Sequence, residues 1–196
     1  MSRALHPCPV YKLLLVILLF VFQSSVHAGE LLKSYVNEQD DHYVLHLDMR
    51  IAAKFDQVYE VLMDFSKMGE VNDSIKSSEL IESNGKTHKL RFLTEGCIWF
   101  FCREVRQMVT VTELGQGYIL SETNPQESDL RYGKTLWQII NEGENTRVKY
   151  NADFVPDFWV PPVFGPAIFQ DRMLEEGKKT LDGIERLSSP TYNQQQ

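Results

Sequence analysis

Cysteine and histidine, the residues that most often build metal and nucleophilic centres, are scarce in this sequence. Its 196 residues include three cysteines and five histidines, and of the histidines His42, His46 and His88 follow residue 28. His42 and His46 share one face of a predicted strand, where a rise of ~3.3 Å per residue holds them roughly 13 Å apart. That distance is too great for two ligands of one ion, so we expect no metal site and interpret the histidines as solvated surface residues.

Positive charge is also in short supply. The chain has 20 lysines and arginines against 27 aspartates and glutamates, a formal net charge of −7. Nucleic-acid binding requires a basic surface, so we expect no nucleic-acid partner. A glycine-rich phosphate loop and a helical HxxxH pair are missing as well, and the sequence therefore predicts neither a nucleotide nor a metal cofactor.

No apolar run is long enough to cross a membrane as a helix. The longest, Leu13 to Phe22, has ten residues, against the roughly 18–20 that a spanning helix needs. It follows Arg3 and Lys12 and precedes small residues that end at Ala28, an order typical of a secretory signal peptide. We expect residues 1–28 to be removed by cleavage near Ala28 and the mature protein to be periplasmic or secreted. The alternative is an uncleaved membrane anchor.

The rest of the chain has the size of one domain with its own hydrophobic core. We expect a single domain over residues 29–188 and a disordered polar tail over residues 189–196. Without the two basic residues of the leader, 18 basic residues stand against 27 acidic ones. The mature surface is therefore expected to be acidic.

Cys97 and Cys102 are the cysteines that would reach an oxidising compartment, which favours a disulfide between them. On one straight strand, residues five apart point to opposite faces and cannot be bridged. Across a hairpin with a four-residue loop they face each other, so we predict a loop tip of sequence IWFF. This tip either touches a membrane surface or folds under the long helix as part of the core. The aromatic residues available for a membrane contact are Trp99, Phe100 and Phe101.

The first part of the mature chain changes from strand to helix periodicity. From His42 to Ala53 apolar and polar residues alternate, which predicts a half-buried strand. Apolar residues then recur at i, i+3, i+4 and i+7, which predicts a short amphipathic helix. The segment that follows, up to Ile75, is expected to be irregular or to form a second short helix. The helical spacing is carried by Val58, Val61, Leu62 and Phe65.

Strand-like runs separated by turns fill the next part of the chain. They include the Asn84-Gly85 turn, a strong hairpin signal, and together with the first strand they make seven strands. The segment from Pro156 to Phe169 is too rich in proline to continue a sheet. From Gly165 to about Leu187 we predict a long helix with one apolar stripe. That stripe consists of Leu174, Gly177, Leu181 and Ile184.

The order strand, helix, short helix, six antiparallel strands and long final helix resembles the START-like, or SRPBCC, superfamily, especially its polyketide cyclase-like and coenzyme Q-binding branch. The resemblance is carried by MRIAAKFDQVYEVLMDFSKMGEVNDSI and PPVFGPAIFQDRMLEEGKKTLDGIERL and extends from about Tyr43 to Leu187. It implies an α+β helix-grip fold, a seven-stranded curved antiparallel sheet wrapped around the long C-terminal helix, with one or two short helices after the first strand. These patterns of apolar and small residues specify a fold well and a function poorly.

The resemblance also implies a cavity between the sheet and the long helix that binds apolar molecules such as lipids, quinones, sterols or polyketides. Its wall would be the concave face of the sheet and the inner stripe of the helix. Ordinary core packing is the alternative for each lining residue, because large aromatic side chains dominate protein cores. The residues expected to line the cavity are Phe92, Trp137, Tyr150, Phe154, Phe158, Trp159, Phe164, Phe169 and Met173.

The expected function is the binding, with or without transport, of a lipid, quinone or other apolar small molecule. One alternative is a cyclase-like or hydratase-like enzyme that acts on an apolar substrate in the same cavity. A second alternative is an interaction protein whose interior is filled. No catalytic constellation stands out, which favours a binding protein over an enzyme. The acid-base groups of an enzyme would have to be strand charges that project inward, such as Asp48, Arg50, Arg91, Glu122 or Lys134.

Overall fold

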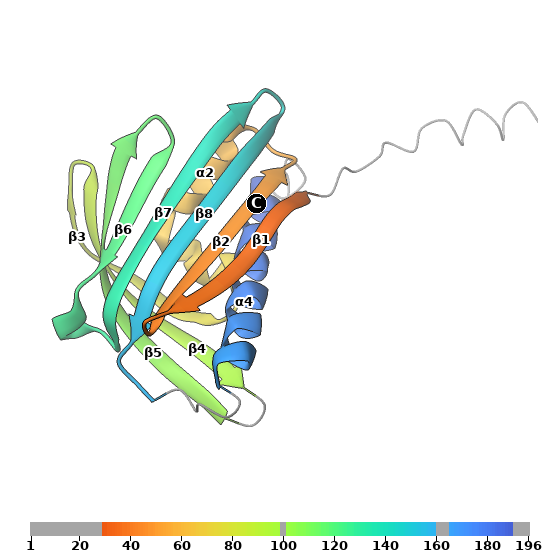
Figure 1. The fold of residues 1–196 in the computed structure, drawn as a ribbon. Helices are drawn as coiled ribbons and strands as arrows, with labels where there is room; N and C mark the ends of the chain where they lie inside the picture. The colour runs from red at the N-terminus through yellow and green to blue at the C-terminus, as the bar shows by residue number, and fades with distance from the viewer. Residues whose placement is uncertain (1–28, 99–100, 160–164, 190–196) are drawn as a thin grey trace, which may run out of the picture.

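An antiparallel sheet curves around a long helix in this protein (Figure 1). The computed structural model describes residues 29–98, 101–159 and 165–189, so the predicted leader and nearly all of the predicted tail lie outside the described residues. The strands are β1 (Glu30–Gln39), β2 (His42–Ile51), β3 (Ile75–Asn84), β4 (Thr87–Ile98), β5 (Phe101–Gly115), β6 (Tyr118–Thr123), β7 (Leu130–Glu142) and β8 (Asn145–Pro156). The helices are α2 (Phe55–Met63), α3 (Met68–Val71) and α4 (Gly165–Ser188), with short 3-10 turns η1 (Phe65–Lys67) and η2 (Pro125–Glu127).

The strands lie in the order β1-β2-β8-β7-β6-β5-β4-β3, and each neighbouring pair is antiparallel. Helix α4 packs against β1 and β2, and α2 lies against β7 and β8 (Figure 1). Helix α3 joins α4 to β3. The predicted α+β helix-grip fold is confirmed by this arrangement, including the short helices after the first predicted strand.

The sheet has eight strands among the described residues, not the seven that the sequence predicted. The additional strand is β1, whose sequence ELLKSYVNEQ has no regular alternation of apolar and polar residues. It is an edge strand that pairs with β2 alone, and most of its side chains are exposed. A strand held mainly by backbone hydrogen bonds at an edge leaves little trace in a hydrophobic pattern.

The core forms where β2 meets α4. Alternate residues of β2 from Tyr43 to Ile51 are buried, as the predicted alternation requires. Leu181 and Ile184 of the predicted helical stripe are completely buried, and Leu174 packs against the same cluster. None of the described helices, the 24-residue α4 included, has both the length and the apolar character to cross a bilayer.

The predicted disulfide joins Cys97 and Cys102, which are directly opposite each other with their Cα atoms 4.0 Å apart. The hairpin differs from the prediction in its loop, because β4 and β5 continue past the cysteines to the pair Ile98 and Phe101. Ile98 and Phe101 thus belong to the two strands and not to the predicted four-residue loop. The side chains of the IWFF tip, including Trp99, Phe100 and Phe101, lie outside the described residues.

Two glycines allow α4 to approach its neighbours closely. A Cβ atom on Gly183 would lie 1.8 Å from the backbone oxygen of Val71 in α3. A Cβ atom on Gly177 would lie 2.5 Å from Leu47 Cδ1 and 3.0 Å from Leu45 Cδ2, both of which belong to side chains of β2. Side chains adjust more readily than backbone, so the contact at Gly183 constrains the position of α4 more strictly.

We expect Gly183→Ala to lower the free energy of unfolding by about 1–3 kcal/mol, because it forces α3 and α4 apart. Gly177→Ala should have a smaller effect, since the leucine side chains that it meets can rotate. Urea unfolding of both variants measures the difference, with Asp182→Ala at an exposed position of α4 as the control. Equal stability of the Gly183 variant and the control would contradict this packing.

An ion pair on the outer face of the sheet connects β2 to β8. Asp48 is 6% exposed and accepts hydrogen bonds from Arg147 Nε and Nη2, each at 2.8 Å. These hydrogen bonds lower the pKa of Asp48 below its ordinary value, and the nearby charge of Lys149 acts in the same direction. Because the folded protein favours the ionised carboxylate, the stabilisation is present above the ordinary aspartate pKa of ~3.9 and is lost as the pH falls through the lower folded value.

At pH 7 we expect Asp48→Asn to lower the thermal midpoint by about 2–4 °C. The difference from the unsubstituted protein should shrink as the pH falls below the ordinary aspartate pKa. Thermal unfolding followed by circular dichroism across this pH range checks both statements. Glu79→Gln is the control, because its pair with Arg91 is exposed and such pairs contribute little. A midpoint difference that stays constant with pH would contradict the role of the Asp48 charge.

Candidate functional site

The strand register determines which side chains face the inside of the curved sheet. Side chains directly opposite each other on neighbouring strands share a face, and the buried residues of β2 face α4. Tyr43 is opposite Phe154, Leu47 is opposite Tyr150, and Tyr150 is in turn opposite Trp137. Continued across β6 and β5 to β4, the same register places Phe92 on this concave face. Four of the predicted lining residues therefore share one wall: Phe92, Trp137, Tyr150 and Phe154.

Aromatic rings gather on this wall in two groups. The rings of Trp137 and Tyr150 are 4.4 Å apart between centroids. The ring of Phe169, on α4, lies 4.6 Å from that of Tyr43 and 6.1 Å from that of Phe154. The predicted residue Met173 lies one turn further along α4 and is buried. Tyr43 was missing from the predicted lining, although its place in the alternating pattern of β2 would have included it.

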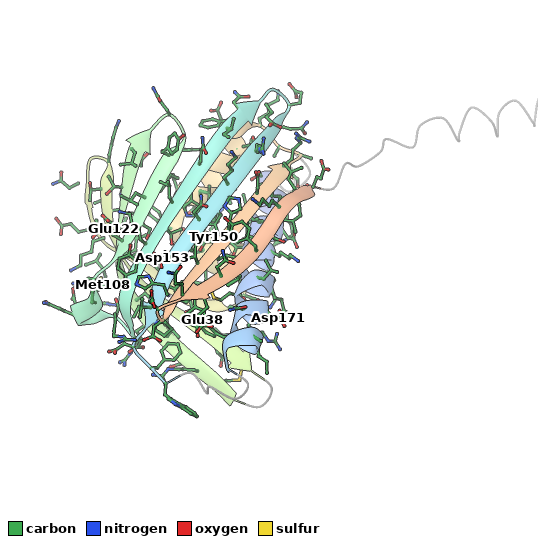
Figure 2. The ribbon with its side chains drawn as sticks, viewed as in Figure 1. Glu38, Met108, Glu122, Tyr150, Asp153 and Asp171 are labelled. Carbon is green, nitrogen blue, oxygen red and sulfur yellow. A yellow bond between two sulfur atoms is a disulfide. The ribbon has the colours of Figure 1, made fainter. Side chains whose placement is uncertain are left out.

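The concave face is closed over β2 and only partly closed over the strands from β4 to β8. The inward side chains of β2 are buried beneath α4, whereas most of those between β4 and β8 are only half-buried. Tyr150, which is labelled in the middle of the sheet in Figure 2, is half-buried, and burial raises the pKa of its hydroxyl. The half-buried inward residues include Phe92, Thr94, Val105, Gln107, Ser121, Thr123, Thr135, Trp137, Tyr150 and Phe154.

Small polar groups are interspersed with the aromatic rings. Thr135 hydrogen-bonds to the Tyr150 side chain. Ser78, opposite Phe92 on β3, has a buried hydroxyl oxygen without a hydrogen-bond partner in the described part of the chain. An unpartnered buried hydroxyl costs free energy, and a bound molecule with a polar group would satisfy it. The wall is thus mainly apolar, with a few polar groups that could orient a ligand.

The remaining predicted lining residues come from the segment after β8. Phe158 is half-buried, with the Arg103 guanidinium 4.5 Å above the centre of its ring. Trp159 is 76% exposed, so the prediction that it lines the interior is corrected. β8 ends at Pro156, so Trp159 lies beyond the end of the sheet strand. Phe164 lies outside the described residues.

The charged residues considered as inward acids and bases lie on the outer face instead. Asp48, like the other even-numbered residues of β2, points away from α4 and is bound by Arg147. The other four charged residues make ion pairs with outer-face residues. One of them, Glu122, is labelled in Figure 2. The nitrogen-oxygen distances are 2.7 Å for Arg50 with Glu142, 2.7 Å for Arg91 with Glu79, and 3.2 Å for Lys134 with Glu122.

A polar network that the sequence did not predict lies at the α2 end of the concave face. Glu113 accepts a hydrogen bond from the Tyr59 hydroxyl, and His88 Nε2 lies 3.2 Å from its other oxygen. His88 Nδ1 is 3.0 Å from the Ser83 hydroxyl. Burial and the contact with Glu113 raise the pKa of Tyr59 to about 12, and the Tyr59 hydrogen bond lowers the pKa of Glu113.

These groups are engaged with one another, so they anchor α2 to the sheet. The prediction that His88 is a solvated surface residue is wrong, because its side chain is 11% exposed and faces inward. His42 and His46 do lie on the outer face, where they contact Asp153 and Asn151. The sequence offered one clue to the network. An acidic residue, Glu113, continues the inward phase of Val109 and Val111.

Potential metal ligands come together at one place in the described part of the chain, namely Glu95, Cys97 and Cys102. The two sulfur atoms are bonded to each other in the disulfide. They are therefore not available as thiolate ligands, which are the form of cysteine that binds metals.

Solved structures of three proteins show the same fold. A STAR-related lipid transfer protein from Xanthomonas axonopodis is 17% identical, with a TM-score of 0.64 over 83% of this chain and 100% of that one. The Zhui aromatase/cyclase from Streptomyces sp. R1128 is 12% identical, with a TM-score of 0.62 over 74% of this chain and 93% of that one. A START superfamily protein from Mycobacterium smegmatis is 19% identical, with a TM-score of 0.60 over 74% of this chain and 98% of that one. Identities this low show a shared fold, not a shared ligand.

No curated protein matches this sequence. Residues 51–176 match the family described as polyketide cyclase / dehydrase and lipid transport. This segment is well over half of the chain and runs from the end of β2 into α4, so it includes most of the concave face. The structural and sequence comparisons agree with the START-like resemblance, and the chain belongs to the polyketide cyclase / dehydrase and lipid transport family.

Proposed function

We propose that this protein binds a lipid, a quinone or another apolar molecule between the concave face of the sheet and α4, and transports it. The observation that carries the proposal is the accessible apolar surface of inward side chains such as Trp137, Tyr150 and Phe154. Removing apolar surface from water contributes roughly 25 cal/mol per Å². An apolar ligand therefore gains free energy wherever it covers this wall.

The polar groups of the wall indicate a ligand that is not purely hydrocarbon. Binding sites for small molecules are mostly apolar, with a few placed polar groups that set orientation. The unpartnered hydroxyl of Ser78 and the Thr135–Tyr150 pair supply such groups. A molecule with an apolar body and a hydroxyl, carbonyl or ester group fits this combination.

Cyclase-like or hydratase-like catalysis remains the alternative, as the family description and the Streptomyces relative allow. It requires an acid or base with access to the ligand. The charged residues considered for that role are paired on the outer face. Tyr59, His88 and Glu113 face inward but are bound to one another. This arrangement favours binding over catalysis.

The proposal includes export of the protein to the periplasm or the exterior. Its support is the sequence of residues 1–28, with a basic start, an apolar run and small residues before Gly29. A carrier in such a compartment would shield its apolar cargo from water between membranes.

A membrane contact at the end of the molecule that holds the cysteine hairpin belongs to the same proposal. The contact of Arg103 with Phe158 brings the base of this hairpin together with the segment after β8. Trp159, in that segment, is 76% exposed. Tryptophan is enriched at membrane interfaces because its ring is apolar and its N–H is polar. We expect Trp159 and the tip residues Trp99, Phe100 and Phe101 to touch the bilayer during loading.

Filling the concave face should abolish binding. Ser121 is half-buried and faces inward, while the neighbouring Leu120 is half-buried and faces outward. We expect Ser121→Phe to reduce the amount of co-purified apolar ligand at least tenfold, measured by native mass spectrometry and analysis of an organic extract. Leu120→Phe is the matched control and should retain the ligand of the unsubstituted protein.

Thermal unfolding must show that Ser121→Phe still folds. A folded Ser121 variant with full ligand occupancy would contradict binding at this wall. An unsubstituted protein that stays empty after incubation with membrane extract would contradict the proposed function itself.

Removing aromatic side chains at the hairpin end should weaken the contact with vesicles. Full burial of one large apolar side chain contributes about 1.5–3 kcal/mol, so Trp159→Ser should reduce vesicle binding roughly tenfold or more. Co-sedimentation with anionic vesicles measures it, and the triple substitution of Trp99, Phe100 and Phe101 by Ser tests the tip. Leu114→Ser, at an exposed position near the opposite end of β5, is the control. Equal loss in the control and in Trp159→Ser would contradict a contact specific to this end.

A further inference from the structure

Glu185 lies in the last turn of α4 in surroundings that disfavour its negative charge. The carboxyl end of a helix carries partial negative charge, and Asp182 adds a further negative charge nearby. Burial raises the pKa of the Glu185 carboxyl. No lysine, arginine or histidine of the described ranges forms a salt bridge with it. Such a carboxylate is unfavourable unless something positive reaches it.

The groups that do reach Glu185 are backbone amides. The N–H groups of Gly29 and Ala52 donate hydrogen bonds to its carboxylate. Gly29 is so close that a Cβ atom on it would lie 2.2 Å from Glu185 Oε2 and 2.6 Å from Met49 Cε. Only glycine fits this position without a shift of its neighbours. The start of the described chain therefore has its backbone nitrogen directed at a partly buried acid.

Gly29 is also the residue that the leader sequence places first in the mature chain. Hydrolysis of the Ala28–Gly29 peptide bond by a leader peptidase consumes one water molecule. It leaves a carboxylate on Ala28 and a primary amine on Gly29. An α-amine has an ordinary pKa of about 7.7–8.0 and is therefore mostly protonated at neutral pH.

We infer that Glu185 is the binding site for the α-ammonium group that cleavage creates on Gly29, so that processing of the precursor completes the fold with a new ion pair. The nitrogen that donates as an amide in the precursor donates as a cation in the mature chain. The pair connects the start of β1 to the end of α4, the two segments that lie next to each other at one corner of the molecule (Figure 1).

This pair would act on one edge of the sheet. β1 is an edge strand with mostly exposed side chains. Its first residue, Glu30, is paired with Arg50 of β2 at 3.1 Å, so that neighbouring charge is already compensated. Fixing Gly29 holds β1 at its start, and the precursor, which lacks the charge, should be less stable.

The test compares a chain that begins at Gly29 with one that retains His27 and Ala28 in front of Gly29, each with and without Glu185→Gln. We expect the chain that begins at Gly29 to have the higher thermal midpoint at pH 7. Glu185→Gln should lower that midpoint by several degrees and change the extended chain much less. Asp182→Asn is the control and should not lower the midpoint of either form.

A second measurement reports on the amine directly. Pairing raises the pKa of the α-ammonium group, so its acylation at pH 7.5 should slow about tenfold for each unit of the rise. Mass spectrometry of the Gly29 peptide measures the rate, and Glu185→Gln should restore fast acylation. While the Glu185 carboxylate is ionised, the stabilisation should be complete below the ordinary amine pKa and be lost as the pH rises through the higher folded value. It should also be lost at acid pH, where the Glu185 carboxyl is protonated.

Three results would overturn the inference: an equal effect of Glu185→Gln in both chain forms, an acylation rate that does not depend on Glu185, or an exported protein whose intact mass shows a first residue other than Gly29. None of these measurements involves the ligand. The inference can therefore fail while the proposed binding function stands, and the reverse is equally true.

Discussion

The mismatch between a strongly curved sheet and the one long helix that crosses it is the constraint on which the rest of this structure depends. Helix α4 covers β1 and β2, and glycines at 177 and 183 let it come close enough to bury the inward side of β2 completely. Even together with α2 it covers only part of the inward side of the strands from β4 to β8. Their aromatic and small polar side chains therefore keep accessible surface in the interior.

The distribution of charge follows from the same division. The outer face carries paired charges, among them the Asp48–Arg147 and Glu122–Lys134 pairs. The inner face carries the Tyr59–Glu113–His88 network, and that network anchors α2 at one end. What remains accessible inside is an apolar wall with isolated hydroxyl groups. A wall of this kind suits recognition of an apolar molecule better than acid-base chemistry.

The sequence predicted the elements with strong periodicity and missed those held by other forces. The alternation in β2 and the helical spacing in α2 and α4 reflect burial, so the core and the fold class could be predicted. β1 is held by edge pairing and its contact with α4, which leave no hydrophobic pattern. The Ser83–His88–Glu113 contacts depend on cross-strand register, as does the assignment of Phe92, Trp137, Tyr150 and Phe154 to one face. Register cannot be read from a single strand, and Trp159 was misplaced because the path of the chain after β8 follows no periodic rule.

A high-resolution crystal structure of the mature protein, purified without detergent, tests most directly whether the concave face is a binding wall. Binding predicts density for an apolar molecule in contact with Trp137, Tyr150 and Phe154, with a polar group near the Ser78 hydroxyl. A structure in which α4 has closed onto these rings and buried them completely would contradict it, because no accessible wall would remain to receive a ligand.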